Sequence, residues 1–600
     1  MFASLKMFSK LNQLKEIVAN AVGNAVFATR VVGRLGVVGR LTPRGLMRFA
    51  RRLNSLTVRP HHAVMLHASS RPQAVALVAN GLSPHPLRLT YAEFDAAANQ
   101  MVNAIRAHGV KTGAKVGLMM HNCSEYMIAQ EGLPRMGAAA VQIGYRLKAA
   151  EVGYIVEHAR PAVLIVGFNC TETAVEALEL VGHQPTLVIV VGSESAALAP
   201  LSSKSSMSPI RQTLEKDNRW LKWETALSSA SAADIPHREP SDGGSLIVYT
   251  SGTTGKPKGA KRMLSETRVS PVLDLLNQIG ARADESHLVT CPLYHAAAPA
   301  FTKMVLSLGG KVVLASGFDA ENVLKLIARE RITSAFMVPT QLARLASLDD
   351  SVRRCHDTSS LRWVMSGAAP LPTETAAQFQ RCFGPILWNF YGATETGTVS
   401  LAGPADHAER PGTVGRLLRD NHALLLDDFR QVVKVGEIGE LWIRNGMIIG
   451  GYHNNTKATA EACLDGYFSV GDLARFDEDG YLYMESRKHD MIISGGVNIY
   501  PREIEEVLHR HPAIREAAIL GVPSLQWGES VCAFVVRSGS AEIFAEEIVA
   551  YCRRQLADYK CPKRVEFLDE LPRNPTGKVL KRVLRQLVSS ERRGTKVSCD

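Results

Sequence analysis

The chain has 600 residues, 46% of them hydrophobic, and a formal net charge of +11. A chain of this length and composition can bury several hydrophobic cores, so we expect at least two domains. Most of the positive charge lies in residues 1–60, where eleven Lys and Arg residues face one acid, so this segment carries +10 and the rest carries +1. The body of the protein is nearly neutral, which excludes nucleic acid as its main partner.

The ten cysteines are scattered and form no C-x-x-C pair. This spacing is typical of thiols in a reducing compartment, and it argues against a disulfide framework or a zinc site. We therefore expect a cytoplasmic protein.

Residues 1–55 are predicted to form a basic, partly amphipathic leader. Its most apolar stretch, residues 17–29, is interrupted by two asparagines and is too short and too polar to span a bilayer. A helix lying on an anionic membrane surface fits the leader, because four arginines can share one face: Arg44, Arg48, Arg51 and Arg52. Two alternatives stay open, a helix packed on the body of the protein and an organellar transit peptide.

Helical and strand patterns alternate from residue 89 to about residue 190, with a helix predicted at 96–108, and the alternation returns after residue 259. Strands are predicted at 115–120, 162–166, 311–315, 334–338 and 363–366. This order predicts an α/β fold with parallel sheets and ligand loops at the strand ends. Residues 185–243 are predicted to form an irregular connection, and residues 423–483 a small β subdomain.

The most informative stretch is residues 249–259, Tyr-Thr-Ser-Gly-Thr-Thr-Gly-Lys-Pro-Lys-Gly, which overlaps a predicted buried strand at 245–250. Its glycines let the backbone approach a polyphosphate, hydroxyl and N–H groups can surround the oxygens, and lysines offset the charge. It is not a Walker A loop, because only two residues separate Gly252 from Gly255. The stretch therefore predicts a polyphosphate-binding loop.

Six further motifs follow this loop in order. They are Cys291-Pro-Leu-Tyr-His295, Ser366-Gly-Ala-Ala-Pro370, Asn389-Phe-Tyr-Gly-Ala-Thr-Glu-Thr-Gly397, Tyr467-Phe-Ser-Val-Gly-Asp-Leu473, the passage from Arg487 to Glu505, and Pro572-Arg-Asn-Pro-Thr-Gly-Lys578. Taken singly, each has a structural explanation, such as a turn at Asp472 or a helix cap at Glu395. Taken together and in this order, they indicate a functional site.

At these motifs the chain resembles the adenylate-forming superfamily of acyl-CoA synthetases, luciferases and peptide-synthetase adenylation domains. The resemblance covers about residues 60–580, and the run 144–158 is similar to bacterial fatty acyl-CoA synthetases. It implies a large N-terminal domain of two α/β sheets plus a small β-barrel, and a mobile, smaller α+β C-terminal domain. The implied divisions are the leader 1–55, an AMP-binding domain 56–486, a lid domain 487–580 and a basic tail 581–600.

The resemblance also implies a two-step reaction. A carboxylate attacks the α-phosphate of ATP to give an acyl-AMP and pyrophosphate, and the thiol of CoA then displaces AMP. Two anions about 4 Å apart repel by about 4 kcal/mol at an effective dielectric constant of about 20, so fixed cations and Mg²⁺ must offset this charge. The implied cofactors are ATP, Mg²⁺ and CoA, with a homodimer as a candidate assembly.

By resemblance, the phosphate loop holds the pyrophosphate end of ATP through Thr250, Ser251, Gly252, Thr253, Thr254, Gly255 and Lys256. The adenine slot is implied to involve Gly367, Ala368, Ala369, Asn389, Tyr391 and Gly392. Thr394 is implied to contact the α-phosphate and Glu395 to position Mg²⁺. Asp472 is implied to accept the ribose hydroxyls, with Arg487 beside it.

Three further roles follow from the resemblance. Lys578 is implied to reach the carboxylate and the α-phosphate in the first step, and the glycine pair Gly495 and Gly496 to contact CoA in the second. His295 is implied to gate the entry of the carboxylate or to fill space beside the adenylate. The hinge falls at His489, where the family usually carries Asp or Lys, and a histidine there could titrate near neutrality.

The acid is the least determined part of the prediction. After His295 come three alanines, Pro299 and Phe301, and we see no Lys, Arg or further His placed to meet a second carboxylate. A long apolar tunnel for a medium- to long-chain fatty acid is the prediction. An aryl or sterol carboxylic acid, and loading of a carrier protein in place of CoA, are the alternatives.

Overall fold

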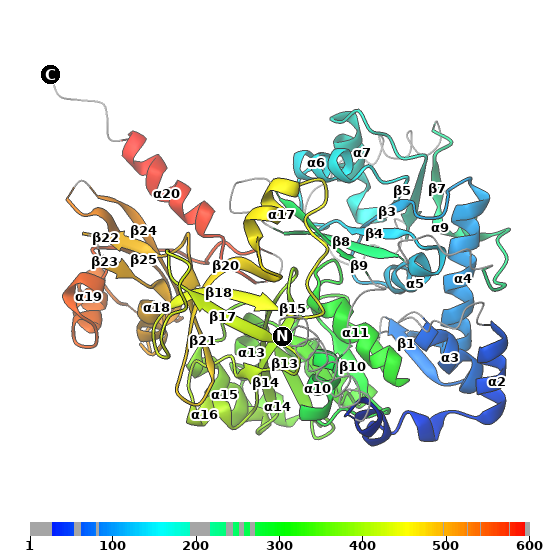
Figure 1. Ribbon diagram of the computed structural model, residues 1–600, viewed down its shortest axis with the longest axis horizontal. Helices are drawn as coiled ribbons and strands as arrows, with labels where there is room; N and C mark the ends of the chain where they lie inside the picture. The colour runs from blue at the N-terminus through cyan, green and yellow to red at the C-terminus, as the bar shows by residue number, and fades with distance from the viewer. Residues whose placement is uncertain are drawn as a thin grey trace, which may run out of the picture.

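The computed structural model describes residues 27–52, 62–79, 83, 85–192, 217–235, 244–250, 257–263, 270–495, 497–524, 526–539, 542–574 and 577–594. Within these residues the chain forms two large α/β sheets, a smaller antiparallel sheet and a separate C-terminal sheet (Figure 1). The predicted α/β class, with a large N-terminal and a smaller C-terminal part, is confirmed.

The larger sheet has nine strands. They are β1 (Val75–Ala79), β2 (Leu87–Thr90), β10 (Ser286–Val289), β11 (Lys311–Leu314), β12 (Ser334–Met337), β13 (Trp363–Ser366), β14 (Leu387–Ala393), β15 (Gly397–Ala402) and β16 (Arg416–Leu417). Their order is β16-β15-β14-β13-β12-β10-β11-β1-β2, and the central pairs are parallel. The middle strands are buried on both faces, which is why they read as continuous apolar runs.

The helices of this part lie along its two faces (Figure 1). They are α10 (Ser270–Gln278), α11 (Ala297–Leu308), α12 (Ala320–Glu330), α13 (Pro339–Ala346), α14 (Asp350–Arg354), α15 (Thr373–Phe383) and α16 (Asp406–Glu409). Asp319 caps α12 by accepting from the N–H of Asn322. The predicted strands at 311–315, 334–338 and 363–366 are confirmed by β11, β12 and β13.

The second sheet has seven strands in the order β7-β6-β5-β3-β4-β8-β9. They are β3 (Lys115–Met119), β4 (Ala139–Gln142), β5 (Val163–Gly167), β6 (Leu187–Val191), β7 (Trp220–Lys222), β8 (Ser245–Thr250) and β9 (Lys258–Met263). The strands predicted at 115–120, 162–166 and 245–250 are confirmed. The irregular connection predicted over 185–243 is wrong in part, because its described residues include two strands, β6 and β7, and the helix α9 (Trp223–Leu227).

Helices flank this sheet as well: α4 (Tyr91–Ala107), α5 (Ser124–Gly132), the 3-10 helix η2 (Leu133–Met136), α6 (Ala149–Ala159), η3 (Phe168–Cys170) and α7 (Thr171–Glu179). The helix predicted at 96–108 is confirmed by α4. It begins earlier than predicted because Thr90 and Glu93 form a capping box, in which each side chain bonds the other's backbone N–H.

The predicted β subdomain is an antiparallel sheet of five strands. They are β17 (His422–Leu426), β18 (Gly439–Arg444), β19 (Cys463–Leu464), β20 (Tyr467–Phe476) and β21 (Leu482–Arg487), accompanied by α17 (Thr456–Ala462). In Figure 1 it lies between the larger sheet and the C-terminal part. This position brings β20 and β21 to the junction of the N-terminal and C-terminal parts.

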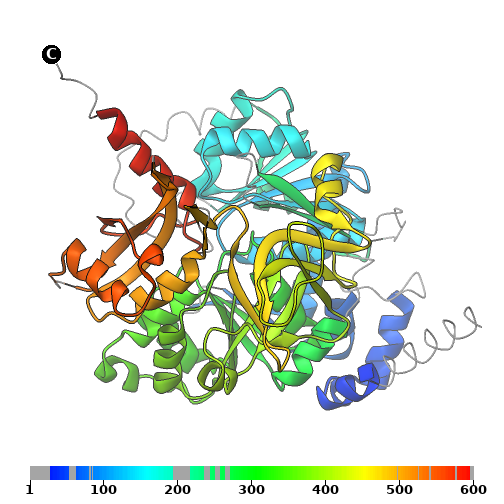
Figure 2. The ribbon, with the colours of Figure 1, turned by 60° about the vertical axis from the view of Figure 1, so that its left-hand side comes forward.

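The C-terminal part has its own sheet and its own cores. The sheet contains β22 (Ile492–Ser494), β23 (Val497–Ile499), β24 (Ile514–Ser524), β25 (Gly528–Arg537) and β26 (Arg564–Phe567), with the helices α18 (Pro501–His509), α19 (Ala545–Arg553) and η5 (Asp558–Lys560). Residues 581–594, placed in a tail by the sequence, form helix α20 (Lys581–Gly594), which packs on β24 (Figure 2). Leu584 and Val588 anchor it in a buried cluster.

The described part of the leader, residues 27–52, packs on the body of the protein. It contains η1 (Val38–Arg40) and α2 (Pro43–Arg52), and α2 lies against α3 (His62–Ser70). Val31 and Leu35 are buried in the main core cluster. Arg44, Arg48 and Arg51 are exposed, whereas Arg52 is half-buried.

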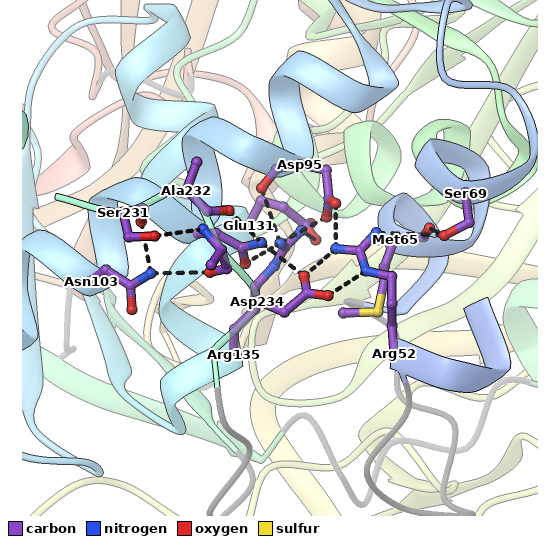
Figure 3. Close-up of polar contacts among 12 residues, drawn as sticks. Arg52, Met65, Ser69, Asp95, Asn103, Glu131, Arg135, Ser231, Ala232 and Asp234 are labelled. Carbon is purple, nitrogen blue, oxygen red and sulfur yellow. Dashed lines mark hydrogen bonds and ion pairs between the residues drawn. The ribbon is translucent and has the colours of Figure 1, made fainter. Parts of the chain in front are cut away.

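Arg52 instead joins a buried ionic network (Figure 3). Its guanidinium contacts Asp95 of α4 at 2.6 Å and also pairs with Asp234. Asp95 in turn lies 2.8 Å from Arg135, which pairs with Glu131 at 3.0 Å. The alternative of a leader segment that packs on the body therefore holds for residues 27–52. Among the described residues, no helix is both long enough and apolar enough to cross a bilayer.

Candidate active site

A cavity of about 940 Å³ opens where the two α/β sheets, the β17–β21 sheet and the C-terminal part meet. Its walls come from β8 and β9, from the turn between β14 and β15, from β20, from α11 and from residues between 573 and 582. These segments are far apart in sequence, so the cavity is a product of the tertiary fold.

The predicted phosphate loop begins and ends at this cavity. Strands β8 and β9 are antiparallel neighbours with Thr250 opposite Lys258, and both residues line the cavity. The loop between them lies outside the described residues, with Ser251, Gly252, Thr253, Thr254, Gly255 and Lys256.

The turn between β14 and β15 presents Thr394 and Glu395 to the cavity. A Cβ added at Gly392 would lie 2.2 Å from the carbonyl oxygen of Gly397, so only glycine permits this close approach of the two strands. Nη2 of Arg262, on β9, donates to the carbonyl oxygen of Thr394 at 2.7 Å. This hydrogen bond ties the turn, which belongs to the nine-stranded sheet, to β9 of the seven-stranded sheet.

Glu395 is a buried carboxylate beside two hydroxyl groups. The hydroxyls of Thr250 and Tyr452 donate to its Oε1 at 3.4 Å and 3.1 Å. Among the described residues, no group of three His, Cys, Asp or Glu side chains could hold a metal ion by itself. Mg²⁺ is commonly held by one or two carboxylates together with nucleotide phosphates, so one carboxylate beside Thr250, where the predicted phosphate loop begins, fits this ion.

Asp472 lies in a hydrogen-bonded corner of the cavity. The register of β20 and β21 places it opposite Arg487, whose Nε lies 3.2 Å from Oδ1. The hydroxyl of Tyr391 donates to Oδ2 at 2.7 Å. Burial and the Asp472 carboxylate raise the pKa of Tyr391 well above its usual value, so this hydroxyl stays a donor.

Lys578 reaches the same cavity from the C-terminal part. Its backbone N–H donates to Oδ1 of Asn574 at 2.9 Å, which shapes the loop that carries it. Burial, together with the positive charge of Arg487, lowers the pKa of the Lys578 ammonium to about 8, while Asp472 and Asp490 oppose this shift. The ammonium is therefore mostly protonated at pH 7 and loses its proton within about one pH unit above that.

Two histidines are kept neutral by their surroundings. Burial and the charge of Arg146 lower the pKa of His295, on the cavity wall, to about 3. Burial also lowers the pKa of His489 at the expected hinge, and Arg487 and Lys578 add to this while Asp490 opposes it. The titration expected for His489 near neutrality is thus moved to lower pH.

The predicted site residues fall into two groups. The cavity lining includes Thr250, His295, Ala368, Gly392, Thr394, Glu395, Asp472, Arg487 and Lys578. Five others are absent from that lining: Gly367, Ala369, Asn389, Tyr391 and Gly495. Gly367 packs closely, since a Cβ there would lie 2.5 Å from the ring of Phe390, and Gly496 is outside the described residues.

The cavity-lining residues that sequence reasoning did not assign to the site include Arg262, Tyr452 and Lys303. Arg262 had a weak signal, because it lies on the strand that returns directly from the phosphate loop. Tyr452 is in no motif. The sequence showed no lysine placed to meet a second carboxylate, and the structure adds Lys303, which lies on the face of α11 that lines the cavity.

Comparison with known proteins agrees with this geometry. Residues 64–453 match the family model described as AMP-binding enzyme, and residues 503–578 match the AMP-binding enzyme C-terminal domain. The long-chain-fatty-acid–CoA ligase FadD13 of Mycobacterium tuberculosis is 33% identical over 84% of this chain and 94% of its own length. The indoleacetate–CoA ligase of Aromatoleum aromaticum is also 33% identical, over 84% of this chain and 93% of its own.

Among solved structures, the amide bond synthetase McbA from Marinactinospora thermotolerans has a TM-score of 0.74 with this chain. It is 28% identical in sequence, and the superposition covers 88% of this chain and 99% of McbA. The similarity therefore extends over both parts of the fold.

Proposed function

Because the chain belongs to the family of AMP-binding enzymes, we propose that this adenylate-forming acid–CoA ligase acts on a medium- to long-chain fatty acid. The acid would be joined to AMP with release of pyrophosphate, and its acyl group would then pass to the thiol of CoA. The observation that carries the proposal is one cavity that brings Glu395, Asp472 and Lys578 together with a wall of small and apolar side chains on α11.

The nucleotide would be held by residues of three separate segments. Asp472 would accept hydrogen bonds from the ribose hydroxyls, and its pairing with Arg487 and Tyr391 keeps its carboxylate oriented. Thr250 and Thr394 would donate to phosphate oxygens, and Glu395 would hold Mg²⁺. When bound, Mg²⁺ neutralises phosphate charge and orients the leaving pyrophosphate.

Lys578 would allow the carboxylate and the α-phosphate to approach each other. An ammonium within hydrogen-bonding distance of both anions offsets a repulsion of about 4 kcal/mol at an effective dielectric constant of about 20. Partial desolvation of this ammonium strengthens its electrostatic effect in the transition state. His295, which is neutral, would shape the entry of the carboxylate and would not add charge.

The second step would use a different arrangement of the C-terminal part. Gly495 lies off the cavity and packs against Trp527, so a glycine turn that guides CoA has to move toward the acyl-AMP. A rotation of the C-terminal part near His489 would move Lys578 out of the cavity and bring the glycine turn into it. The proposal thus includes a C-terminal part that serves the two steps in two positions.

The acid would lie along α11. We define the acid arm as the part of the cavity lined by Ala297, Ala300, Lys303 and Met304 of this helix. Small side chains at two successive turns leave room for an acyl chain, and the name of FadD13 supports a fatty acid. The name of the indoleacetate ligase supports the alternative of an aryl acid.

The test is an acid panel with the full-length protein. Fatty acids from short to long chains and a set of aryl acids are supplied with ATP and Mg²⁺, and pyrophosphate release is measured with and without CoA. We expect medium- and long-chain acids to give the highest kcat/KM, with release of acyl-CoA only when CoA is present. A preference for aryl acids would contradict the fatty-acid proposal. Pyrophosphate release without formation of any acyl-CoA would contradict CoA as the acceptor of the acyl group.

A further inference from the structure

The acid arm contains a lysine in an otherwise apolar stretch of wall. Ala297, Ala300, Lys303 and Met304 follow one another at helical spacing on the face of α11 that lines the cavity. Lys303 is six residues beyond Ala297, which places it about 9 Å further along the helix at about 1.5 Å per residue. An acid whose carboxylate lies near the start of α11 would therefore direct its far end toward Lys303.

The Lys303 ammonium has no direct partner. Among the described residues, none lies within hydrogen-bonding or ion-pair distance of its Nζ, and the acid that influences it is Glu131 of α5. The carboxylate of Glu131 is already paired with Arg135 at 3.0 Å, inside the buried network of Figure 3. Burial lowers the pKa of Lys303, and Glu131 opposes this shift. Lys303 is half-buried, and a partly desolvated cation without a partner gains from a bound anion.

Other polar groups of the same cavity also lack partners. Oε1 of Gln130, Nε2 of Gln142 and the hydroxyl of Tyr294 are buried without a hydrogen bond within the described part of the chain. All three residues line the cavity, and Gln130 immediately precedes Glu131 on α5. Arg146 is another positively charged residue of the lining. Buried polar atoms are normally satisfied, so this group is typical of a site that receives its partner from a ligand.

We propose that the acid arm recognises a second oxygen-bearing group on the acyl chain, best a carboxylate, and that Lys303 is the residue that pairs with it. The substrate class is then an aliphatic acid with a second acid group about 9 Å from the reacting carboxylate, such as a medium-chain α,ω-dicarboxylic acid. This inference rests on the proposed function and narrows its substrate. Gln130, Gln142 and Tyr294 line the same cavity and offer further donors and acceptors to a ligand there.

The competing explanation is that Lys303 only balances the charge of Glu131. In that case Lys303, Glu131 and Arg135 only stabilise the fold, and the acid arm prefers an acid with a plain alkyl chain. The two explanations differ in the ratio of kcat/KM for a dicarboxylic acid to that for the monocarboxylic acid of the same carbon number. This ratio cancels effects on ATP binding and on the amount of active protein.

The experiment uses full-length protein and pyrophosphate release with matched pairs of acids, from about six to about sixteen carbons. For at least one chain length, we expect the wild-type ratio to favour the dicarboxylic acid by about 10-fold or more. Lys303→Met should lower that ratio by about 10- to 100-fold, the range of a hydrogen bond to a charged group. Lys303→Arg should keep most of the preference. Lys325→Met removes an exposed lysine on α12 that pairs with Glu321, and it should leave the ratio unchanged.

A second readout is independent of turnover. Without ATP, the preferred dicarboxylic acid should raise the melting temperature of the wild-type protein and of Lys303→Arg more than that of Lys303→Met. If Lys303→Met does not fold, the inference is still tested by the ratio of kcat/KM values in the wild-type protein and in Lys303→Arg. A wild-type preference for monocarboxylic acids at every length, or a ratio unaffected by Lys303→Met, overturns the inference alone. Absence of pyrophosphate release with every acid would instead overturn the proposed function.

Discussion

Lys578 has a charge that is sensitive to pH because of where it lies. Its ammonium is buried beside Arg487, and both influences favour the neutral amine, whereas Asp472 and Asp490 favour the charged form. The balance leaves its pKa at about 8 instead of the usual 10.5. The protonated form, which the proposed first step needs, is therefore present below about pH 8 and is lost as the pH rises through that value.

The first prediction concerns this titration. The kcat/KM for acid-dependent pyrophosphate release should fall as the pH rises through about 8, because this parameter reports groups of the free enzyme. Lys578→Arg should abolish the fall, since a guanidinium stays protonated over the whole range. The measurement is the pH profile of both proteins between about pH 6 and pH 10. An identical fall in the Arg variant would assign the titration to another group.

At the scale of elements, the short loop that carries Lys578 docks on helix α13 of the N-terminal part. Gly577 has φ of +76°, a left-handed conformation that residues with a side chain adopt only with strain. A Cβ there would also lie 3.1 Å from the hydroxyl of Thr340 on α13. The position of Lys578 in the cavity thus depends on a glycine that allows two elements of different parts to meet.

The second prediction tests this docking with a matched pair of glycine variants. Gly577→Ala should lower the rate of pyrophosphate release by about 10-fold, because about 1–2 kcal/mol of backbone strain opposes the docked position. Turnover of synthetic acyl-AMP with CoA should change less, since that step does not use the docked loop. Gly480→Ala, in the turn between β20 and β21, has φ of +79° and open space around it. It should leave the ratio of the two rates unaltered.

At the scale of the whole molecule, one cavity receives side chains from both parts of the fold. Glu395 and Asp472 come from the N-terminal part, Lys578 comes from the C-terminal part, and Gly495 lies off the cavity. A single arrangement therefore supplies the groups proposed for forming acyl-AMP, and a movement of the C-terminal part is needed for the proposed approach of CoA.

The third prediction separates the two steps. Lys578→Ala should lower acid-dependent pyrophosphate exchange by about 100- to 1,000-fold, as the removal of one transition-state donor typically does. The same protein should convert synthetic acyl-AMP and CoA to acyl-CoA at close to the wild-type rate. Lys563→Ala, an exposed lysine of the C-terminal part, is the control for both assays. Equal losses in the two assays would contradict the assignment of Lys578 to the first step.

The leader shows where sequence patterns stop being informative. Arg44, Arg48, Arg51 and Arg52 recur at helical spacing, and in the structure three of them are exposed as a basic face would be. Arg52 is half-buried and pairs with Asp95 and Asp234, which come from segments far along the chain. Contact of the leader with a membrane stays a prediction, because its first 26 residues are outside the described part.

The amino-acid sequence alone determined the fold class and the order of the motifs, and the residues proposed for the nucleotide follow from the family resemblance that these motifs carry. The fold class and the motifs depend on local chemistry, such as the glycines and hydroxyls of a phosphate loop and the alternation of strands and helices. Such signals lie within a few residues of one another, so they can be read without knowing what is packed against them.

Only the tertiary structure decided which side chains share the cavity. Arg262 meets Thr394 across 132 residues, Tyr452 meets Glu395 across 57, and Lys303 faces the acid arm because of the rotational position of α11. The physical reason is that a cavity is formed by surfaces that close on one another, and the phase of each helix and the register of each strand are set by packing between distant segments.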